Sequence, residues 1–402
     1  MILPFQFGCV LLDTHPLLLS FFTHVPIEFV LFALLLLSIA VFHKHVFPIA
    51  IAGVVIIAVY KLMFTELDMA HHLLHESLTL VNLLGLLVGF AVLTGFFEKS
   101  KLPDLLPNYL PDDWKGGALL IVAVAILSTF LDNIAAAIIG GTVARKVYHG
   151  KVHIAFVASI VASSNAGGAG SVIGDTTTTM MWIGGVPAFG VVHAYLGSIP
   201  CVTLLAIMGG TIQQSYHPIQ KDAEPGIRVQ SKYLIASALI IAGVIAANVL
   251  IDFPAAGVWL AIGVSLLFVN YEWSSMPSAF KGAIFLICLV FAASMMPVDQ
   301  LPEPTWISTL TLGFVSAIFD NIPLTKLALS QGGYDWGILA YAVGFGGSMI
   351  WFGSSAGVAI SGLFPEARST VKWISNAWFV VLAYLVGFGT VLLMHGWHPL
   401  AL

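Results

Sequence analysis

Two short motifs place an aspartate beside an asparagine between apolar arms, and both are candidates for binding a cation or a proton. They are Asp132-Asn133 and Asp320-Asn321, 188 residues apart. A carboxylate at membrane depth costs ~2.5–3.5 kcal/mol or more, so an aspartate buried there usually has a function. The alternative is that each aspartate only caps a helix. We expect a function for both, because Ser or Thr would cap a helix at a far lower desolvation cost.

A glycine-rich stretch after the first motif offers further oxygen ligands. It contains Ser163, Ser164, Asn165 and the carbonyl group of Gly167, and it is followed by Asp175. Hard oxygen ligands suit a small alkali cation. Glycines also let the backbone come close to a bound ion. We therefore expect these groups to complete a cation site with the Asp-Asn motifs.

Hydroxyl groups continue this pattern beyond Asp175 and recur in the second half of the chain. Four threonines begin at Thr176, which we expect to contribute to the site. The alternative is that the threonine hydroxyls bond back to their own helix. The comparable positions of the second half carry Ser348, Ser354 and Ser355. Ser354 aligns with Asp175, so the two halves are chemically unequal.

The composition is that of a membrane protein. Of the 402 residues, 59% are apolar and only 9% are charged, and the mean hydropathy is +0.98. An ordinary soluble domain is ~25% charged, so these charges are too few to cover a water-facing surface. The composition excludes soluble enzymes and nucleic-acid binders. The net charge of −5 is small, and the positions of Lys and Arg report orientation in the bilayer.

Apolar runs that could span a bilayer, which takes ~20 residues, recur along the chain. They are roughly 26–42, 46–64, 77–97, 189–213, 232–251, 254–271, 281–297 and 373–394. Between them lie two irregular stretches, 115–184 and 305–364, which are apolar but interrupted by glycines and aspartates. The candidate ligands all lie in these two stretches.

The irregular stretches are copies of each other. Residues 128–134 align with 316–322, and Gly167-Gly168 aligns with Gly346-Gly347. Each copy is also preceded by three apolar runs and followed by one. The chain is therefore predicted to be a duplication.

Each copy is too irregular for straight helices alone. Residues 115–148 form two apolar arms with basic residues at both ends, which predicts a re-entrant hairpin. Residues 152–184 are too long for one helix and are interrupted at 163–170, which predicts a broken helix. Irregular backbone survives at this depth where it is buried in protein or lines a polar cavity.

We predict an all-α polytopic membrane protein made of two inverted-topology repeats. Each repeat has five spans, including one broken helix, and one re-entrant hairpin, and the odd number of crossings inverts the second copy. The predicted units are an interfacial segment 1–25, repeat 1 at 26–213, a cytoplasmic linker 214–231, repeat 2 at 232–394 and a tail 395–402. With both termini extracytoplasmic, every Lys and Arg except Lys61 and Lys326 falls on the cytoplasmic side, as the positive-inside rule requires.

The motifs resemble the signature of NhaD-type sodium/proton antiporters. The resemblance rests on Leu131-Asp132-Asn133 and on residues 163–178, and it covers nearly the whole membrane domain. That family lies in the ion transporter superfamily, with arsenite permeases and citrate or dicarboxylate carriers. The resemblance implies exchange of sodium or lithium for protons, an inverted-repeat fold and a homodimer. We accordingly expect a multi-pass protein of a bacterial inner membrane that uses no cofactor.

We predict that sodium and protons compete for aspartates near the membrane midplane. Sodium would bind at Asp132, Ser164, Asn165 and Asp320, because burial disfavours a bare carboxylate and makes either cation a good partner. The predicted core holds three aspartates against one lysine, Lys326, so the site selects a cation. Lys326 either neutralises a carboxylate or reaches the outer surface.

Other functions remain open at this point. Within transport, they are sodium-coupled uptake of a carboxylate and export of an oxyanion such as arsenite. A remote alternative is an intramembrane aspartyl protease that uses Asp132 and Asp175. Proteolysis would not explain the matching Asp320-Asn321 motif.

Polar residues outside the motifs receive structural interpretations. His71, His72 and His75 lie near the start of the third span. We interpret them as an interfacial patch, with a pH sensor as the alternative. Boundary or structural roles are the expectation for Glu28, Glu98, His193 and His217.

Overall fold

The computed structural model describes residues 25–42, 45–220 and 226–400, and the described chain is helical without a β-strand. The first half contains α2 (Ile27–Val41), α3 (Val46–Phe64), α4 (Met69–Lys99), α5 (Leu106–Tyr109), α6 (Trp114–Ser128), α7 (Asn133–Val147), α8 (Ile154–Gly168), α9 (Thr176–Ile183) and α10 (Tyr195–Tyr216). The second half contains α11 (Ser231–Ile251), α12 (Pro254–Ser265), α13 (Met276–Ser294), α14 (Trp306–Ser316), α15 (Asn321–Gln331), α16 (Trp336–Gly346), α17 (Ser355–Ile360), α18 (Thr370–Asn376) and α19 (Phe379–His395). Residues 1–24, which hold nearly all of the expected interfacial segment, lie outside the described residues, as do 221–225 of the expected linker and 401–402 of the expected tail.

The helices have the lengths and apolar surfaces of a multi-pass membrane protein. Among the described helices, α3, α4, α10, α11 and α13, two of them with short extensions, are long and apolar enough to cross a membrane. Shorter apolar helices accompany them: α2, α6, α8, α12 and α14. Large apolar side chains remain exposed on outer helices; Leu267 and Leu393, for example, are 85% and 88% exposed. In water such a surface would be unfavourable, whereas hydrocarbon accepts it.

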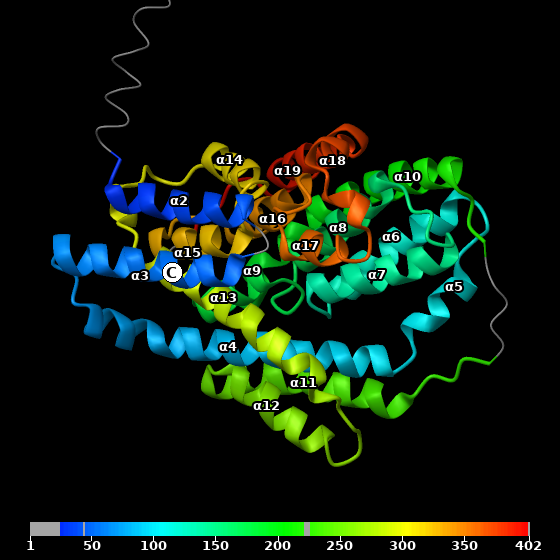
Figure 1. The fold of residues 1–402 in the computed structure, drawn as a ribbon, viewed down its shortest axis with the longest axis horizontal. Helices are drawn as coiled ribbons and strands as arrows, with labels where there is room; N and C mark the ends of the chain where they lie inside the picture. The colour runs from blue at the N-terminus through cyan, green and yellow to red at the C-terminus, as the bar shows by residue number, and fades with distance from the viewer. Residues whose placement is uncertain (1–24, 43–44, 221–225, 401–402) are drawn as a thin grey trace, which may run out of the picture.

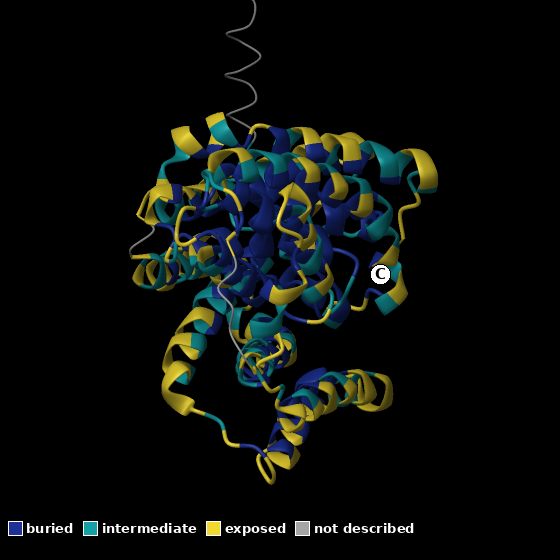
Figure 2. Ribbon diagram, turned by 90° about the vertical axis from the view of Figure 1, so that its right-hand side faces the viewer, coloured by how far each residue is buried: buried dark blue, intermediate teal, exposed yellow. Residues whose placement is uncertain are grey.

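The helices gather into two groups (Figure 1). In one group α4 contacts α11, α12 and α13, and α13 contacts α3. The other group contains α6 to α10 together with α14 to α19, in which α10 lies against both α6 and α19. Contacts of α13 with α15 and of α4 with α9 join the groups. Figure 2 shows that buried residues concentrate inside the larger body.

Three expectations about the elements need correction. The third span begins at Met69 rather than near residue 77, because the Asp68 carboxylate accepts hydrogen bonds from the Ala70 and His71 N–H groups and starts α4 there. The run 373–394 is not one straight span, since α18 and α19 meet at a bend of 61°.

The third correction concerns the predicted interruption at 163–170. Helix α8 continues through Gly168, and the break lies at 169–175. Glycine does not unwind this helix; Gly167 instead faces the backbone of Ala125 so closely that an added Cβ would overlap it. The glycine is therefore needed for the close approach of α6.

Candidate functional site

Three aspartates lie at the N-termini of three short helices. Asp132 precedes α7, Asp175 precedes α9 and Asp320 precedes α15. Each helix begins inside the protein, where its unpaired N–H groups and its dipole favour negative charge. Among the described residues, the N-termini of these three helices, rather than basic side chains, thus stabilise the three aspartate carboxylates.

The three carboxylates differ in how they use their helices. Asp175 accepts a hydrogen bond from the Thr177 N–H group, at 3.1 Å, and Asp320 accepts one from the Ile322 N–H group, at 3.0 Å. Asp132 makes no side-chain capping hydrogen bond to α7. Helix capping hydrogen bonds therefore account for part of the roles of Asp175 and Asp320.

Asn133 connects the first motif to the end of α8. Its Nδ2 atom donates to Asn165 Oδ1 at 2.9 Å and to Asp175 Oδ1 at 3.2 Å. Asn133, Asn165 and Asp175 are each no more than 3% exposed. Buried amides with complete donor bonding have fixed orientations, so the acceptor oxygens around them are held in place.

Two further hydrogen bonds connect this network to the second half of the chain. Asn165 Nδ2 donates to Ser348 Oγ at 2.8 Å, and Asn321 Nδ2 donates to Thr177 Oγ1 at 2.9 Å. Thr177 in turn donates to Asp175 Oδ1 at 3.2 Å. Residues from both Asp-Asn motifs are thus brought together around Asp175.

Several oxygens of this network are buried without a hydrogen-bond partner in the described part of the chain. They are Asp132 Oδ1, Asn133 Oδ1, Asp175 Oδ2 and Ser163 Oγ. An unsatisfied buried polar atom is costly. Carboxylate and amide oxygens are also the ligands that alkali cations take. The site therefore has the chemistry of a proton or cation site.

A cavity of about 600 Å³ meets this site at Asp132. Its lining also includes Thr176, Ser355, Glu98 and Lys99. Lys99 is paired with the exposed carboxylate of Glu272 at 2.9 Å. Glu98, which we interpreted as a boundary charge, therefore also lines the approach to Asp132.

The serines of the second half have three different environments. Ser348 accepts from Asn165, whereas Ser354 Oγ accepts from the Gly357 N–H group and caps α17. Ser355 donates to Asp320 Oδ2 at 3.5 Å and also lines the cavity.

The hydroxyl groups of the first half divide in the same way. Ser164 donates to the carbonyl of Val161, its own helix, at 2.8 Å. Thr178 and Thr179 both donate to the Asp175 carbonyl at 2.9 Å. These two hydroxyls also donate to the carbonyls of Ser171 and Val172, so they bond to backbone before α9 as well as to its N-cap residue. The Gly167 carbonyl accepts from Thr129 Oγ1 at 3.3 Å, on the side of α6.

The lone lysine expected in the core lies beside a different carboxylate. Lys326 Nζ contacts both carboxylate oxygens of Glu76 in α4 at 2.9 Å. Both side chains are about a tenth exposed. Lys326 therefore neutralises a carboxylate, but that of Glu76 rather than one of the three aspartates of the predicted core, because α4 brings Glu76 against α15. Glu28, expected to be a boundary charge, is likewise buried and paired with Lys61 at 3.2 Å.

The histidine patch lies beside the Lys326–Glu76 pair. His72 Nε2 is 2.9 Å from Ser294 Oγ of α13, and His75 Nδ1 is 3.9 Å from Glu76. The lining of the cavity, over the described residues, does not include these histidines. The structure therefore places them apart from Asp132.

Comparison with known proteins points to one kind of transporter. No family model matches the chain. A protein of Arabidopsis thaliana named sodium/proton antiporter 1 is 25% identical over 377 residues, which cover 80% of this chain and 61% of that protein. The Na(+)/H(+) antiporters NhaD of Halomonas elongata and Vibrio parahaemolyticus are each 24% identical, over 78% and 79% of this chain and 74% and 90% of their own lengths. The chain resembles NhaD-type sodium/proton antiporters. It spans about three fifths of the length of the Arabidopsis protein, and the similarity to the NhaD proteins extends over most of both chains.

Proposed function

We propose that this protein exchanges sodium or lithium ions for protons across the membrane. The observation that carries the proposal is the buried network of Asp132, Asn133, Asn165 and Asp175 at the inner end of the cavity. Asp132 is the principal binding group, because it meets the cavity and its Oδ1 atom accepts no hydrogen bond from the described residues. The names of the related antiporters support the same activity.

Exchange follows from competition at one carboxylate. A buried carboxylate is stabilised by a proton or by a sodium ion, and binding of one disfavours binding of the other. The negative charges of Asp132 and Asp320 both act on Asp175, so the cluster attracts one cation strongly and repels an anion. Asp320 completes the site from the second half and helps to set the number of charges moved per cycle.

The architecture supplies alternating access. In our proposal α6–α7 and α14–α15 are re-entrant hairpins from opposite sides, and α8–α9 and α16–α17 are broken helices of two inverted repeats. Rocking of these hairpin-bearing elements would expose the aspartates to each side in turn. The cavity opens beside Lys99, at an end that the positive-inside rule assigns to the cytoplasm. The described state is then open to the cytoplasm. In this proposal the protein lies in a bacterial inner membrane and forms a homodimer.

Carriers of anions require compensating positive charge, but the three helix N-termini of this site already face the carboxylates of Asp132, Asp175 and Asp320. Lys99 is the only basic residue in the described lining, and it is paired with Glu272 at the cavity mouth. Lys326 is held by Glu76. Neither a carboxylate nor an oxyanion would find a cationic side chain near Asp132. Proteolysis is also disfavoured. A protease would need the Asp175 carboxylate for catalysis, and Asn133 already donates a hydrogen bond to that carboxylate.

Everted vesicles containing the protein provide the test. They should dissipate a preformed pH gradient when sodium or lithium chloride is added, and choline chloride should have no effect. Vesicles without the protein are the control. Sodium-dependent uptake of citrate or succinate, with no response of the pH gradient to either ion, would show that the protein is a carboxylate carrier instead.

A further inference from the structure

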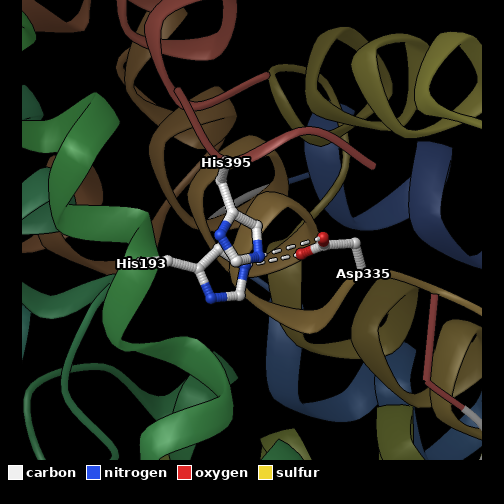
Figure 3. A group of neighbouring side chains, drawn as sticks. All are labelled: His193, Asp335 and His395. Carbon is white, nitrogen blue, oxygen red and sulfur yellow. Dashed lines mark hydrogen bonds and ion pairs between the residues drawn. The ribbon is translucent and has the colours of Figure 1, made fainter. Parts of the chain in front are cut away.

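Three side chains that could hold a metal ion meet outside the ion-binding network (Figure 3). His193 lies in the short helix η2 (Ala188–Ala194) before α10, Asp335 precedes α16, and His395 is the last residue of α19. One ligand atom from each of the three lies within 4.8 Å of the others. Neither the cavity nor the hydrogen bonds of the Asp132 network include these residues.

The Asp335 carboxylate is the fixed centre of this cluster. Its side chain is 1% exposed, and its oxygens accept hydrogen bonds from the Ile338 and His398 N–H groups at 3.1 and 3.0 Å. These two bonds orient the carboxylate while leaving further lone pairs on both oxygens. Partners of this kind position metal ligands in known sites.

Both imidazoles present Nε2 to that carboxylate. His193 Nε2 is 2.6 Å from Oδ1, and His395 Nε2 is 3.8 Å from Oδ2. The two rings are stacked, with centroids 3.9 Å apart and planes 19° apart. A structural His–Asp hydrogen bond requires one imidazole only. His395 Nε2 is too far from Asp335 for a hydrogen bond. Its position is explained if the Nε2 atoms of His193 and His395 and the Asp335 carboxylate bind the same ion.

The neighbouring backbone is adapted to the position of His193. A Cβ atom at Gly337 would overlap the His193 ring, so α16 can come this close only with glycine there. On the other side, Leu400 N–H donates to the Tyr334 carbonyl at 3.0 Å and holds the end of the chain over the cluster. The chain segment that carries His395 is thereby fixed against Asp335.

We propose that His193, Asp335 and His395 form a binding site for a divalent transition metal of the zinc class. Two imidazoles and one carboxylate are a typical zinc ligand set, with bond lengths of ~2.0–2.2 Å and a fourth position for water or another ligand. On metal binding, the His193 Nε2 contact with Asp335 would be replaced by a bond to the metal, and His395 Nε2 would approach the same ion. His398, whose ring centroid is 5.1 Å from that of His395, packs beside the cluster.

A metal here would fasten the two halves of the chain together. His193 belongs to the first half, whereas Asp335 and His395 belong to the second, 142 residues further along in the case of Asp335. His193 and His395 are 17% and 33% exposed, so an ion can reach the site from solution. Bound metal therefore stabilises the folded protein without entering the sodium pathway.

Metal titration of the purified full-length protein in detergent tests this proposal. After treatment with a chelator, the protein is titrated with zinc chloride in a calorimeter and its melting temperature is measured with and without zinc. Cobalt(II) is used in parallel, because its visible spectrum reports tetrahedral coordination. The variants are His395→Ala and His193→Gln, of which the glutamine retains an N–H donor for Asp335. His217→Ala, which changes a histidine outside the cluster, is the matched control.

We expect one zinc ion per chain for the natural protein and for His217→Ala, with a rise in melting temperature. Each cluster variant should bind at least ~10-fold more weakly and lose the rise. The proposal is overturned if the natural protein binds no stoichiometric zinc, or if both cluster variants bind zinc as the natural protein does. His395 lies at a helix end and is partly exposed, so its variant remains informative even if His193→Gln does not fold.

Discussion

The Asn165 side chain donates its amide to Ser348 Oγ at 2.8 Å, across 183 residues of sequence, and so joins the two halves of the chain inside the buried core. Asn165 also accepts from Asn133. One amide thus contacts both Asn133 of the first Asp-Asn motif and Ser348 of the second half.

We expect this hydrogen bond to appear as a coupling energy. Asn165→Ala removes one of the two acceptors of the Asn133 amide and the donor to Ser348 Oγ, whereas Ser348→Ala leaves one amide hydrogen of Asn165 unpaired. Each single change should cost ~1–3 kcal/mol of stability. The double variant should cost less than the sum by ~0.5–3 kcal/mol. The apparent sodium affinity of exchange and the melting temperature are measured for all three, and strict additivity would show that the bond does not contribute.

The charge of Asp132 is the feature on which the proposed exchange depends most directly. Asp132→Asn keeps the shape and removes the charge, so exchange should fall to the level of vesicles without the protein while the protein remains folded. Asp252→Asn is the matched control, because Asp252 is exposed and has a left-handed backbone, at φ 52°, that asparagine also adopts readily. Near-normal exchange by Asp132→Asn would restore the helix-cap interpretation.

Removing the charge of Asp320 should reduce exchange less completely than removing the charge of Asp132. Its carboxylate caps α15 through Ile322, and asparagine caps a helix about as well as aspartate. Asp320→Asn should therefore fold normally and still lose most of its exchange, since the second carboxylate of the site is gone. Exchange at the natural rate would leave Asp320 as a cap only.

Two threonines of α9 allow the hydroxyl groups of the network to be compared with hydroxyl groups that bond only to backbone carbonyls. Thr177 accepts from Asn321 and donates to Asp175, whereas Thr179 donates to carbonyl groups only. Thr177→Val should weaken the apparent sodium affinity about tenfold, equivalent to ~1.4 kcal/mol. Thr179→Val, an identical change two residues away, should leave it within about twofold. Equal effects of the two changes would show that the Asn321 link is unimportant for binding.

The Lys326–Glu76 ion pair should stabilise the fold rather than bind the transported ion. Lys326→Met leaves a buried carboxylate uncompensated and should cost ~3–5 kcal/mol, whereas the double change with Glu76→Gln should recover most of this loss. The double variant should retain exchange. Thermal unfolding and vesicle assays measure the two effects, and loss of exchange in a stable double variant would return Lys326 to the transport site.

Sequence patterns singled out several residues that the structure brings together, but they did not predict the surroundings of these residues. Asp132-Asn133 and Asp320-Asn321 stand out because a charged residue within apolar sequence is costly wherever it folds. The extent of α8 was predicted wrongly. The preference of glycine for irregular backbone can be seen in the local sequence, whereas the close contact of Gly167 with Ala125 is made by a residue distant in sequence. The partner of Lys326 could not be predicted either, since Glu76 is 250 residues away. The same is true of the His193–Asp335 contact, for which no local pattern exists.

The dependence of sodium affinity on pH is the sharpest test of a shared carboxylate. Where the site is mostly protonated, sodium must displace a proton, so the sodium concentration at half-maximal exchange should rise about tenfold per unit fall in pH, or ~1.4 kcal/mol per step. At high pH the site is already free of protons and the affinity should become constant. The sign follows from mass action: lowering the pH adds the competitor, and raising it removes the competitor.

The measurement is a series of vesicle assays between about pH 6 and pH 9, with the maximal rate fitted separately from the affinity. A constant affinity throughout, with only the maximal rate changing, would exclude competition at one carboxylate and indicate a separate pH sensor, for which the patch of His71, His72 and His75 is the first candidate. Replacing those three histidines with glutamine should leave the tenfold slope unchanged if the carboxylate is shared, because the described lining of the cavity does not include them.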